Sequence, residues 1–226
     1  MNVVPFHFWL AVTRLGQAEV LLPLALAMAL VLLFNGRAGW AWVVPFGAAV
    51  LATLATKIAF IGWGVGIRSL DFTGVSGHAM LAASVYPVLG YMLGSRLPWR
   101  SGMRAGAALG VVVAAMVAYS RLVVHAHSPS EAISGFALGA VASTVCLYLM
   151  RGAAQGQARP LFSPAVGMAM LTWVLVFPIQ APASTSQEIV IRLALLLSQH
   201  DRPYQRADLF RPRLQQQGLQ PPASRV

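Results

Sequence analysis

The chain has 226 residues, of which 58% are hydrophobic and only 10% are charged, and its mean hydropathy is +0.68. A soluble domain carries about 25% charged residues, so this chain has too few polar groups to cover a surface that faces water. The net charge of +10 does not indicate nucleic-acid binding, because the arginines are spread over short connections and form no single patch. The composition therefore predicts a membrane protein.

Six apolar runs follow one another along the chain, each close to the ~20 residues that cross a ~30 Å hydrocarbon core. Such spans are helices, because in lipid every backbone group needs a partner within its own segment. We therefore predict an all-α polytopic membrane protein, a six-transmembrane-helix bundle, over residues 1–184. An interfacial helix over 5–18 precedes the first span. The predicted spans are roughly 19–35, 40–61, 78–95, 104–121, 131–150 and 162–182.

The tail, residues 185–226, differs from this domain in composition. Its apolar stretch 189–197 is too short to span and contains Arg192, which indicates a helix at the membrane interface. Beyond His200 the chain is rich in Arg, Gln and Pro, which is typical of a solvated and partly disordered extension. The sequence therefore predicts one membrane domain followed by a basic tail.

The charges of the connections predict how the bundle is oriented. The connections after the first, third and fifth spans carry basic residues and no acids. By the positive-inside rule they lie in the cytoplasm. We therefore expect a multi-pass protein of the inner (cytoplasmic) membrane whose opposite connections face the periplasm or outside. The basic residues concerned are Arg37, Arg96, Arg100, Arg104, Arg151 and Arg159.

The opposite connections hold most of the unusual side chains. Lys57 is the only lysine of the chain. Between residues 72 and 187 every histidine and acidic residue lies on this side, and Arg121 lies there too. Ionisable groups at the ends of spans indicate function, so we place the candidate site within 57–131. The histidines and the acid are His78, His125, His127 and Glu131.

Ser128-Pro129-Ser130-Glu131 has the pattern of a helix start, with Ser at the N-cap, Pro at the first position and Glu at the third. Glu131 can complete a capping box. It can also accept the ring N–H of His127 and orient that imidazole. The two interpretations are compatible. His125 and His127 are two residues apart and point in different directions, so we expect only His127 to be central.

Ser76-Gly77-His78 also opens a predicted helix, where Ser76 can form the cap and Gly77 allows a ligand close to the backbone. Two helix N-termini together with Lys57 and Arg121 favour an anion, and phosphate in particular. A metal site is the alternative, although Lys57 and Arg121 would repel a cation. Its ligands would be His78, His125, His127 and Glu131. We predict no metal and no other cofactor.

The pattern Ser120-Arg121-x5-His127-x3-Glu131, preceded by Ser76-Gly77-His78 and Lys57, resembles the type 2 phosphatidic acid phosphatase family. This family comprises membrane lipid phosphate phosphatases that share their site with soluble acid phosphatases and vanadium haloperoxidases. The resemblance covers roughly residues 55–140. It departs from the family in three places. The first motif usually has Arg-Pro seven residues after the lysine, whereas the next basic residue here is Arg68; Val75 replaces a proline, and Glu131 replaces an aspartate.

The resemblance implies a phosphohydrolase that forms a phosphohistidine on His127, with His78 as the proton donor and Glu131 orienting His127. The implied phosphate-binding residues are Lys57, Arg121, Ser76, Gly77 and Arg68. The substrate would be a lipid phosphate or diphosphate, such as undecaprenyl diphosphate, phosphatidylglycerol phosphate or phosphatidic acid. A phosphotransferase with the same intermediate and a non-catalytic membrane transporter or scaffold are the alternatives. The sequence does not indicate an oligomeric state.

Overall fold

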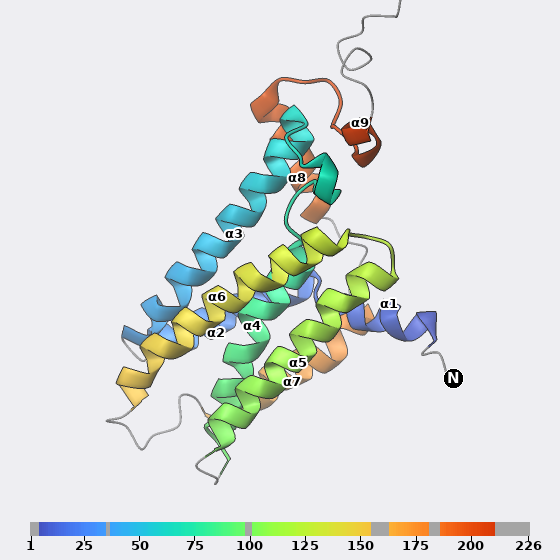
Figure 1. The fold of residues 1–226 in the computed structure, drawn as a ribbon. Coiled ribbons are helices and arrows are strands. Elements are labelled where there is room, and N and C mark those ends of the chain that lie inside the picture. The colour runs from blue at the N-terminus through green and yellow to red at the C-terminus, as the bar shows by residue number, and fades with distance from the viewer. Residues whose placement is uncertain (1–4, 35–36, 98–100, 155–162, 181–185, 211–226) are drawn as a thin grey trace, which may run out of the picture.

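The computed structural model describes residues 5–34, 37–97, 101–154, 163–180 and 186–210. Within these residues the chain is helical, and one isolated antiparallel bridge joins Ile67 to Phe72 (Figure 1). The elements, in chain order, are α1 (Phe6–Arg14), α2 (Ala18–Leu33), α3 (Arg37–Trp63), the short helix η1 (Arg68–Leu70), α4 (Gly77–Gly94), α5 (Gly102–Val123), α6 (Pro129–Ala154), α7 (Pro164–Gln180), α8 (Ser186–Ser198) and α9 (Arg206–Phe210).

Each of the six predicted apolar runs forms a helix, so the all-helical fold class is confirmed. Four segments of the described chain are long and apolar enough to cross a membrane, which indicates a multi-pass membrane protein. The predicted count of six spans is not confirmed. The apolar part of α7, Pro164–Pro178, is too short, whereas α4 has enough residues, 18, but is not apolar enough. The four segments are Phe6–Leu33, Gly39–Trp63, Gly102–Val123 and Pro129–Met150.

α4 forms the centre of the bundle, and nearly all of its residues are buried. It packs closely against α5 and α6 (Figure 1). Gly106 on α5 faces Gly90 on α4 so closely that a Cβ atom on either residue would overlap the carbonyl of the other. The small residues at spacing four on α5 therefore serve helix packing, as their spacing predicts.

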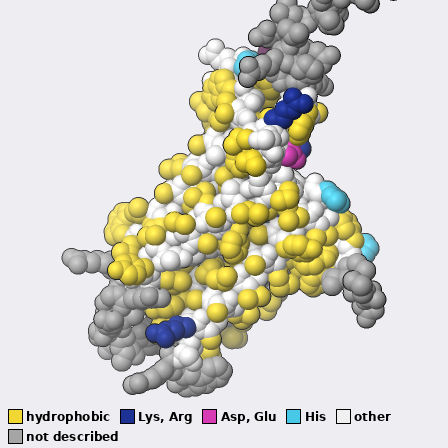
Figure 2. Space-filling model, viewed as in Figure 1, with side chains coloured by type: hydrophobic (Ala, Val, Ile, Leu, Met, Phe, Trp, Pro, Cys, Tyr) yellow, Lys and Arg dark blue, Asp and Glu magenta, His cyan; other side chains and the backbone are white. Residues whose placement is uncertain are grey.

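The outward surface of the bundle is apolar. Figure 2 shows hydrophobic side chains over most of the visible body, with charged side chains near its ends. Leu51, Leu109 and Val141 are examples of large aliphatic side chains that point outward. A surface of this kind suits contact with lipid chains.

Four helix ends meet at one end of the bundle, because α3 and α5 finish there and α4 and α6 begin there. The tail covers this end. α8 packs on the end of α3, where Val190 and Ala194 contact Phe60 and Ile61 (Figure 1). The tail up to residue 210 therefore belongs to the structure around this end, although the sequence separates it from residues 1–184. The extension predicted beyond His200 is described only up to residue 210, where it includes α9, and the rest of it lies outside the described residues.

Candidate active site

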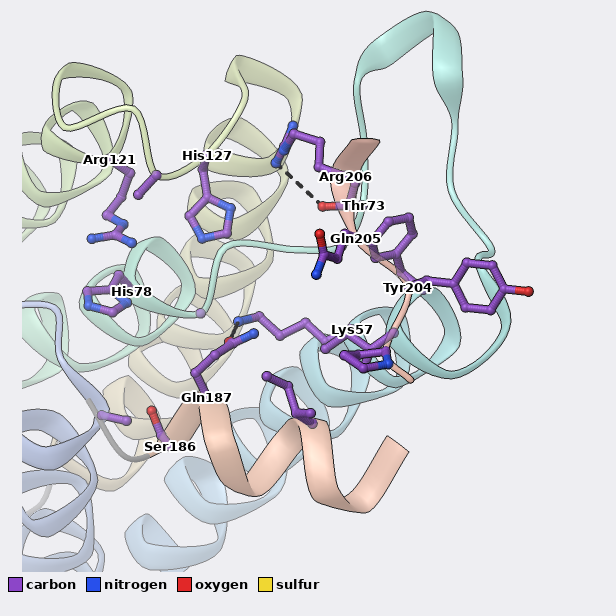
Figure 3. A pocket seen from close by; sticks show the side chains of 18 of the residues that line it. Lys57, Thr73, His78, Arg121, His127, Ser186, Gln187, Tyr204, Gln205 and Arg206 are labelled. Carbon is purple, nitrogen blue, oxygen red and sulfur yellow. Dashed lines mark hydrogen bonds between the residues drawn. The ribbon is translucent and has the colours of Figure 1, made fainter. Parts of the chain in front are cut away.

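A cavity of about 570 Å³ lies where these helix ends meet. Lys57, His78, Arg121 and His127 face one space within it (Figure 3). Among the described residues no acidic side chain lines this cavity, so its walls favour an anion. The remaining wall includes apolar side chains from several helices, namely Ala18, Phe60, Ile61, Leu81 and Ile191.

The start of α6 is built by a reciprocal pair of hydrogen bonds. The Glu131 amide donates to Ser128 Oγ at 3.4 Å, and the Ser128 amide donates to Glu131 Oε2 at 3.2 Å. The same Oε2 atom lies 2.7 Å from Nδ1 of His127. Glu131 therefore closes a capping box and also contacts the histidine, and both interpretations of this acid hold.

Donors hold the Glu131 carboxylate at both oxygens, and the side chain is 0% exposed. Oε1 accepts from the Thr73 amide at 2.7 Å and from Thr73 Oγ1 at 2.5 Å. Oε2 additionally accepts from Nη2 of Arg206 at 2.6 Å. A buried charge needs such partners to be tolerated, and here they also fix the direction in which the carboxylate faces His127.

This contact determines which nitrogen of His127 is free. Because Nδ1 faces a carboxylate, Nδ1 carries the ring proton and donates a hydrogen bond to Glu131. The unprotonated nitrogen with the free lone pair is therefore Nε2. Burial lowers the pKa of His127, the hydrogen bond to Glu131 opposes that effect, and the charges of Lys57 and Arg121 lower the pKa further. The ring is therefore held in its neutral form, as a nucleophile or base requires.

The basic groups come from different helices. Lys57 Nζ on α3 donates to Gln187 Oε1 at 3.3 Å, and Arg121 Nη1 on α5 donates to Thr13 Oγ1 at 2.6 Å. The Nε atom of Arg121 is buried and has no hydrogen-bond partner within the described part of the chain. A Cβ on Gly77 would meet only Lys57 Nζ, at 4.0 Å, so the backbone here is open to a ligand. Phosphate oxygens would satisfy these donors.

Besides Glu131, three of the residues considered in the sequence do not line the cavity. Ser76 precedes α4, but its hydroxyl makes no capping bond; it is buried and has no partner among the described residues. Arg68 is exposed and lies over the ring of Phe210, at 5.8 Å from its centroid. His125 is exposed, as expected for the histidine that is not central. The predicted role of Arg68 as a phosphate ligand therefore has no support from this geometry and stays a prediction.

The convergence of two free helix N-termini is only half correct. The first turn of α4 opens to the cavity through Gly77 and His78. At the start of α6, however, the capping box already uses the Ser128 and Glu131 amides. Of these two helix starts, only the first turn of α4 lines the cavity in the described part of the chain, so its amides are the ones placed to face an anion there.

Sequence reasoning missed Thr73, Gln187 and Arg206. Thr73 and Arg206 hold Glu131, and Gln187 holds Lys57. Arg206 lies 75 positions after Glu131, and Gln187 lies 130 positions after Lys57. No local spacing connects residues so far apart, so only the folded tail reveals them.

The alternative metal site is not assembled in the described residues. No group of three His, Cys, Asp or Glu side chains among them is placed to hold an ion. His125 lies outside the cavity, and both oxygens of Glu131 are occupied by donors. The arrangement instead presents a neutral imidazole to a positively charged cavity.

Comparison with known proteins decides the family. The family model of the PAP2 superfamily matches residues 6–154, a range that holds His78, Arg121, His127 and Glu131. The chain belongs to the PAP2 superfamily. This match confirms the resemblance found in the sequence. The protein is therefore a phosphatase.

Two relatives extend the comparison. This chain is 35% identical over 207 residues to an uncharacterized 22.5 kDa protein in the cps region of Klebsiella pneumoniae. The alignment covers 90% of this chain and 98% of the relative. The chain is 30% identical over 139 residues to phosphatidylglycerophosphatase B of Bacillus subtilis (strain 168), which covers 57% of this chain and 66% of the relative. No solved structure shows a significant match.

Proposed function

We propose that this PAP2 protein is an integral membrane lipid-phosphate phosphohydrolase that works through a phosphohistidine on His127. The observation that carries the proposal is the His127–Glu131 contact of 2.7 Å, which leaves Nε2 as the free nitrogen of a ring that lines a basic cavity. Lys57, Arg121 and the amide of Gly77 would hold the non-bridging oxygens of the phosphate. The buried hydroxyl of Ser76 would donate a further hydrogen bond to the phosphate if it turned toward the ligand.

The reaction would proceed in two displacements. In the first, Nε2 of His127 attacks phosphorus, an N–P bond forms, and the P–O bond to the lipid breaks while His78 donates a proton to the leaving oxygen. In the second, His78 takes a proton from water, the water oxygen attacks phosphorus, and the N–P bond breaks. Inorganic phosphate leaves and both histidines return to their starting state. Glu131 stabilises the charge that develops on the His127 ring.

The two kinds of cavity wall support the proposed substrate class. Phe60, Leu81 and Ile191 give the cavity an apolar side next to its basic groups. An amphiphile would place its phosphate on the basic side and its chain along the apolar side. A relative named phosphatidylglycerophosphatase B supports a lipid phosphate. The substrates proposed are those named from the resemblance: undecaprenyl diphosphate, phosphatidylglycerol phosphate and phosphatidic acid.

We further propose that α4 and α7 also cross the membrane, which gives six spans. α4 is enclosed by α5 and α6, so its less apolar residues face protein and need no lipid. Its 18 residues extend about 27 Å at 1.5 Å per residue, close to the hydrocarbon thickness.

The cavity would face the periplasm or outside of the inner membrane, because Arg96 and Arg104 lie at the opposite end. Labelling with a membrane-impermeant thiol reagent tests this orientation in a Cys146→Ala background. The exposed Ser69 lies at the cavity end and the exposed Ser101 at the other. Ser69→Cys should react from outside, and Ser101→Cys should not. The reverse pattern would contradict the orientation.

Phosphate release in ¹⁸O-labelled water tests the hydrolysis itself. Purified protein in detergent, given short-chain phosphatidic acid or phosphatidylglycerol phosphate, should release inorganic phosphate that contains one labelled oxygen. His127→Ala should release none, whereas the exposed neighbour variant His125→Ala should stay active. Consumption of the lipid phosphate only when an alcohol acceptor is added, with the phosphoryl group found on that alcohol and no inorganic phosphate released, would instead show a phosphotransferase.

A further inference from the structure

We propose that Arg206 is a positioning residue of the active site, which holds Glu131 in the orientation that directs His127, and that the C-terminal segment exists in part to deliver it. This inference rests on the proposed function. Arg206 lies well beyond residue 154, where the match to the PAP2 family model ends. It is therefore a feature of this chain that the family motifs do not contain.

Arg206 joins the loop that contains Asp71 to the start of α6. Its Nη2 donates to Glu131 Oε2 on α6 at 2.6 Å. Its Nη1 lies 2.7 Å from Asp71 Oδ2 and donates to the Asp71 carbonyl at 3.0 Å. The loop that contains Asp71 continues into Thr73, the other partner of Glu131 (Figure 3). One guanidinium therefore fastens the loop and the carboxylate to each other.

The partners of Arg206 indicate that it acts through Glu131. Arg206 lines the cavity, but both of its terminal nitrogens are engaged by Glu131 and Asp71 oxygens, so its guanidinium is committed to these partners and not to a phosphate. The Oε2 atom that it contacts also accepts from His127. A change at Arg206 would therefore alter the direction and charge of the group that orients the nucleophile.

The backbone around Gly64 makes room for this segment. Gly64 stands seven residues after Lys57, the position where the family's first motif usually has arginine. Its φ is +69°, and a Cβ here would lie 2.9 Å from the ring of Tyr204. The Tyr204 amide donates to the Ile61 carbonyl at 2.9 Å, which docks the tail against the end of α3. Tyr204 thus occupies the space that a side chain at position 64 would need. Two residues after Tyr204, the same segment brings the guanidinium of Arg206 to the site.

The test compares three variants at steady state with a short-chain lipid phosphate in detergent. Arg206→Ala should lower kcat roughly 10- to 100-fold, as loss of an outer orienting partner does, with little change in KM. Arg206→Lys should recover part of the loss, because it keeps a charge but cannot bridge two partners. Arg202→Ala is the matched control, since Arg202 is an exposed arginine of the same segment; it should behave as wild type.

A double-mutant cycle separates positioning from mere stabilisation of the tail. If Arg206 acts through Glu131, Arg206→Ala should cost almost nothing further in a Glu131→Gln background. Fully additive losses, or a wild-type kcat in Arg206→Ala, would overturn the inference. Docking is measured without turnover by hydrogen exchange at the Tyr204 amide, which should be slow in the wild type; fast exchange there would also overturn it. A wild-type protein that hydrolyses no lipid phosphate would instead overturn the proposed function.

Discussion

His127 Nδ1 lies 2.7 Å from Oε2 of Glu131, a residue four positions further along the chain. The carboxylate that orients the histidine is also the acid of the capping box that begins α6. His127 itself lies before the helix, so the capping box places the pair: it holds Glu131 in the first turn of α6 with its carboxylate directed back toward residues 127 and 128. The orientation of the His127 ring is thus set by the same residue that caps the helix after it.

Glu131→Gln separates the two roles of this residue. Glutamine also serves in a capping box, so α6 should form as in the wild type. Its amide has one acceptor oxygen and one donor nitrogen, so it cannot accept from both Thr73 and His127 as the carboxylate does. We expect kcat to fall by at least about 100-fold, by analogy with loss of the triad carboxylate. The measurement is turnover together with thermal stability in detergent.

Glu188→Gln is the control for that experiment, because Glu188 is an exposed acid on α8. It should leave both turnover and thermal stability unchanged. Wild-type turnover in Glu131→Gln would mean that the acid serves only the helix.

Arg121 and Arg68 should respond in opposite ways to removal. Arg121 lines the cavity, whereas Arg68 lies outside it against Phe210. Arg121→Ala should lower kcat/KM by roughly 100-fold or more, because it removes a charge-assisted donor from a buried phosphate site. Arg68→Ala should stay within about threefold of wild type, since its contact is at the surface. Equal losses in the two variants would show that Arg68 reaches the substrate.

The protonation of His127 can be followed directly by NMR of ring-labelled histidine. Its pKa lies below the usual 6.5, because burial and the charges of Lys57 and Arg121 outweigh the hydrogen bond to Glu131. The neutral ring should therefore persist as the pH falls through 7 and through 6.5, and it should protonate only below that value. The His127→Ala spectrum assigns the signal. A titration midpoint above 6.5 would contradict a ring held ready as a nucleophile.

Activity should survive exhaustive treatment with EDTA, because Lys57, Arg121 and the α4 N-terminus supply the positive field. Vanadate should inhibit, since a five-coordinate adduct on His127 mimics the transition state of phosphoryl transfer. The measurement is phosphate release before and after chelation, with and without vanadate. Activity that is lost to EDTA, returns with a divalent ion and ignores vanadate would support the metal alternative.

Much of the fold and the centre of the site could be predicted from the sequence, because their signals are local. Long apolar runs predict helices wherever they occur, and the Ser128-to-Glu131 pattern predicts both the start of α6 and the neighbour of His127. The number of spans was harder to predict. α4 is enclosed by other helices, so its composition is set by protein contacts and not by lipid.

The outer part of the site could not be predicted, because it depends on contacts between distant segments. Arg68 follows Lys57 closely in sequence, yet the turn closed by the Ile67–Phe72 bridge places it outside. Arg206 is far away in sequence, and a docked tail brings it to Glu131. The composition of the segment that carries Arg206 resembles that of a solvated extension. Only the packing of α8 and Tyr204 on α3 shows that this segment docks at the site.

Trapping the covalent intermediate tests the central claim most directly. The protein would be mixed with a ³²P-labelled short-chain lipid phosphate, denatured rapidly at alkaline pH to preserve phosphohistidine, and digested to locate the label. We expect an acid-labile phosphoryl group on His127, present also in His125→Ala and missing from His127→Ala. A label on any other residue, or wild-type phosphate release by His127→Ala, would contradict the account.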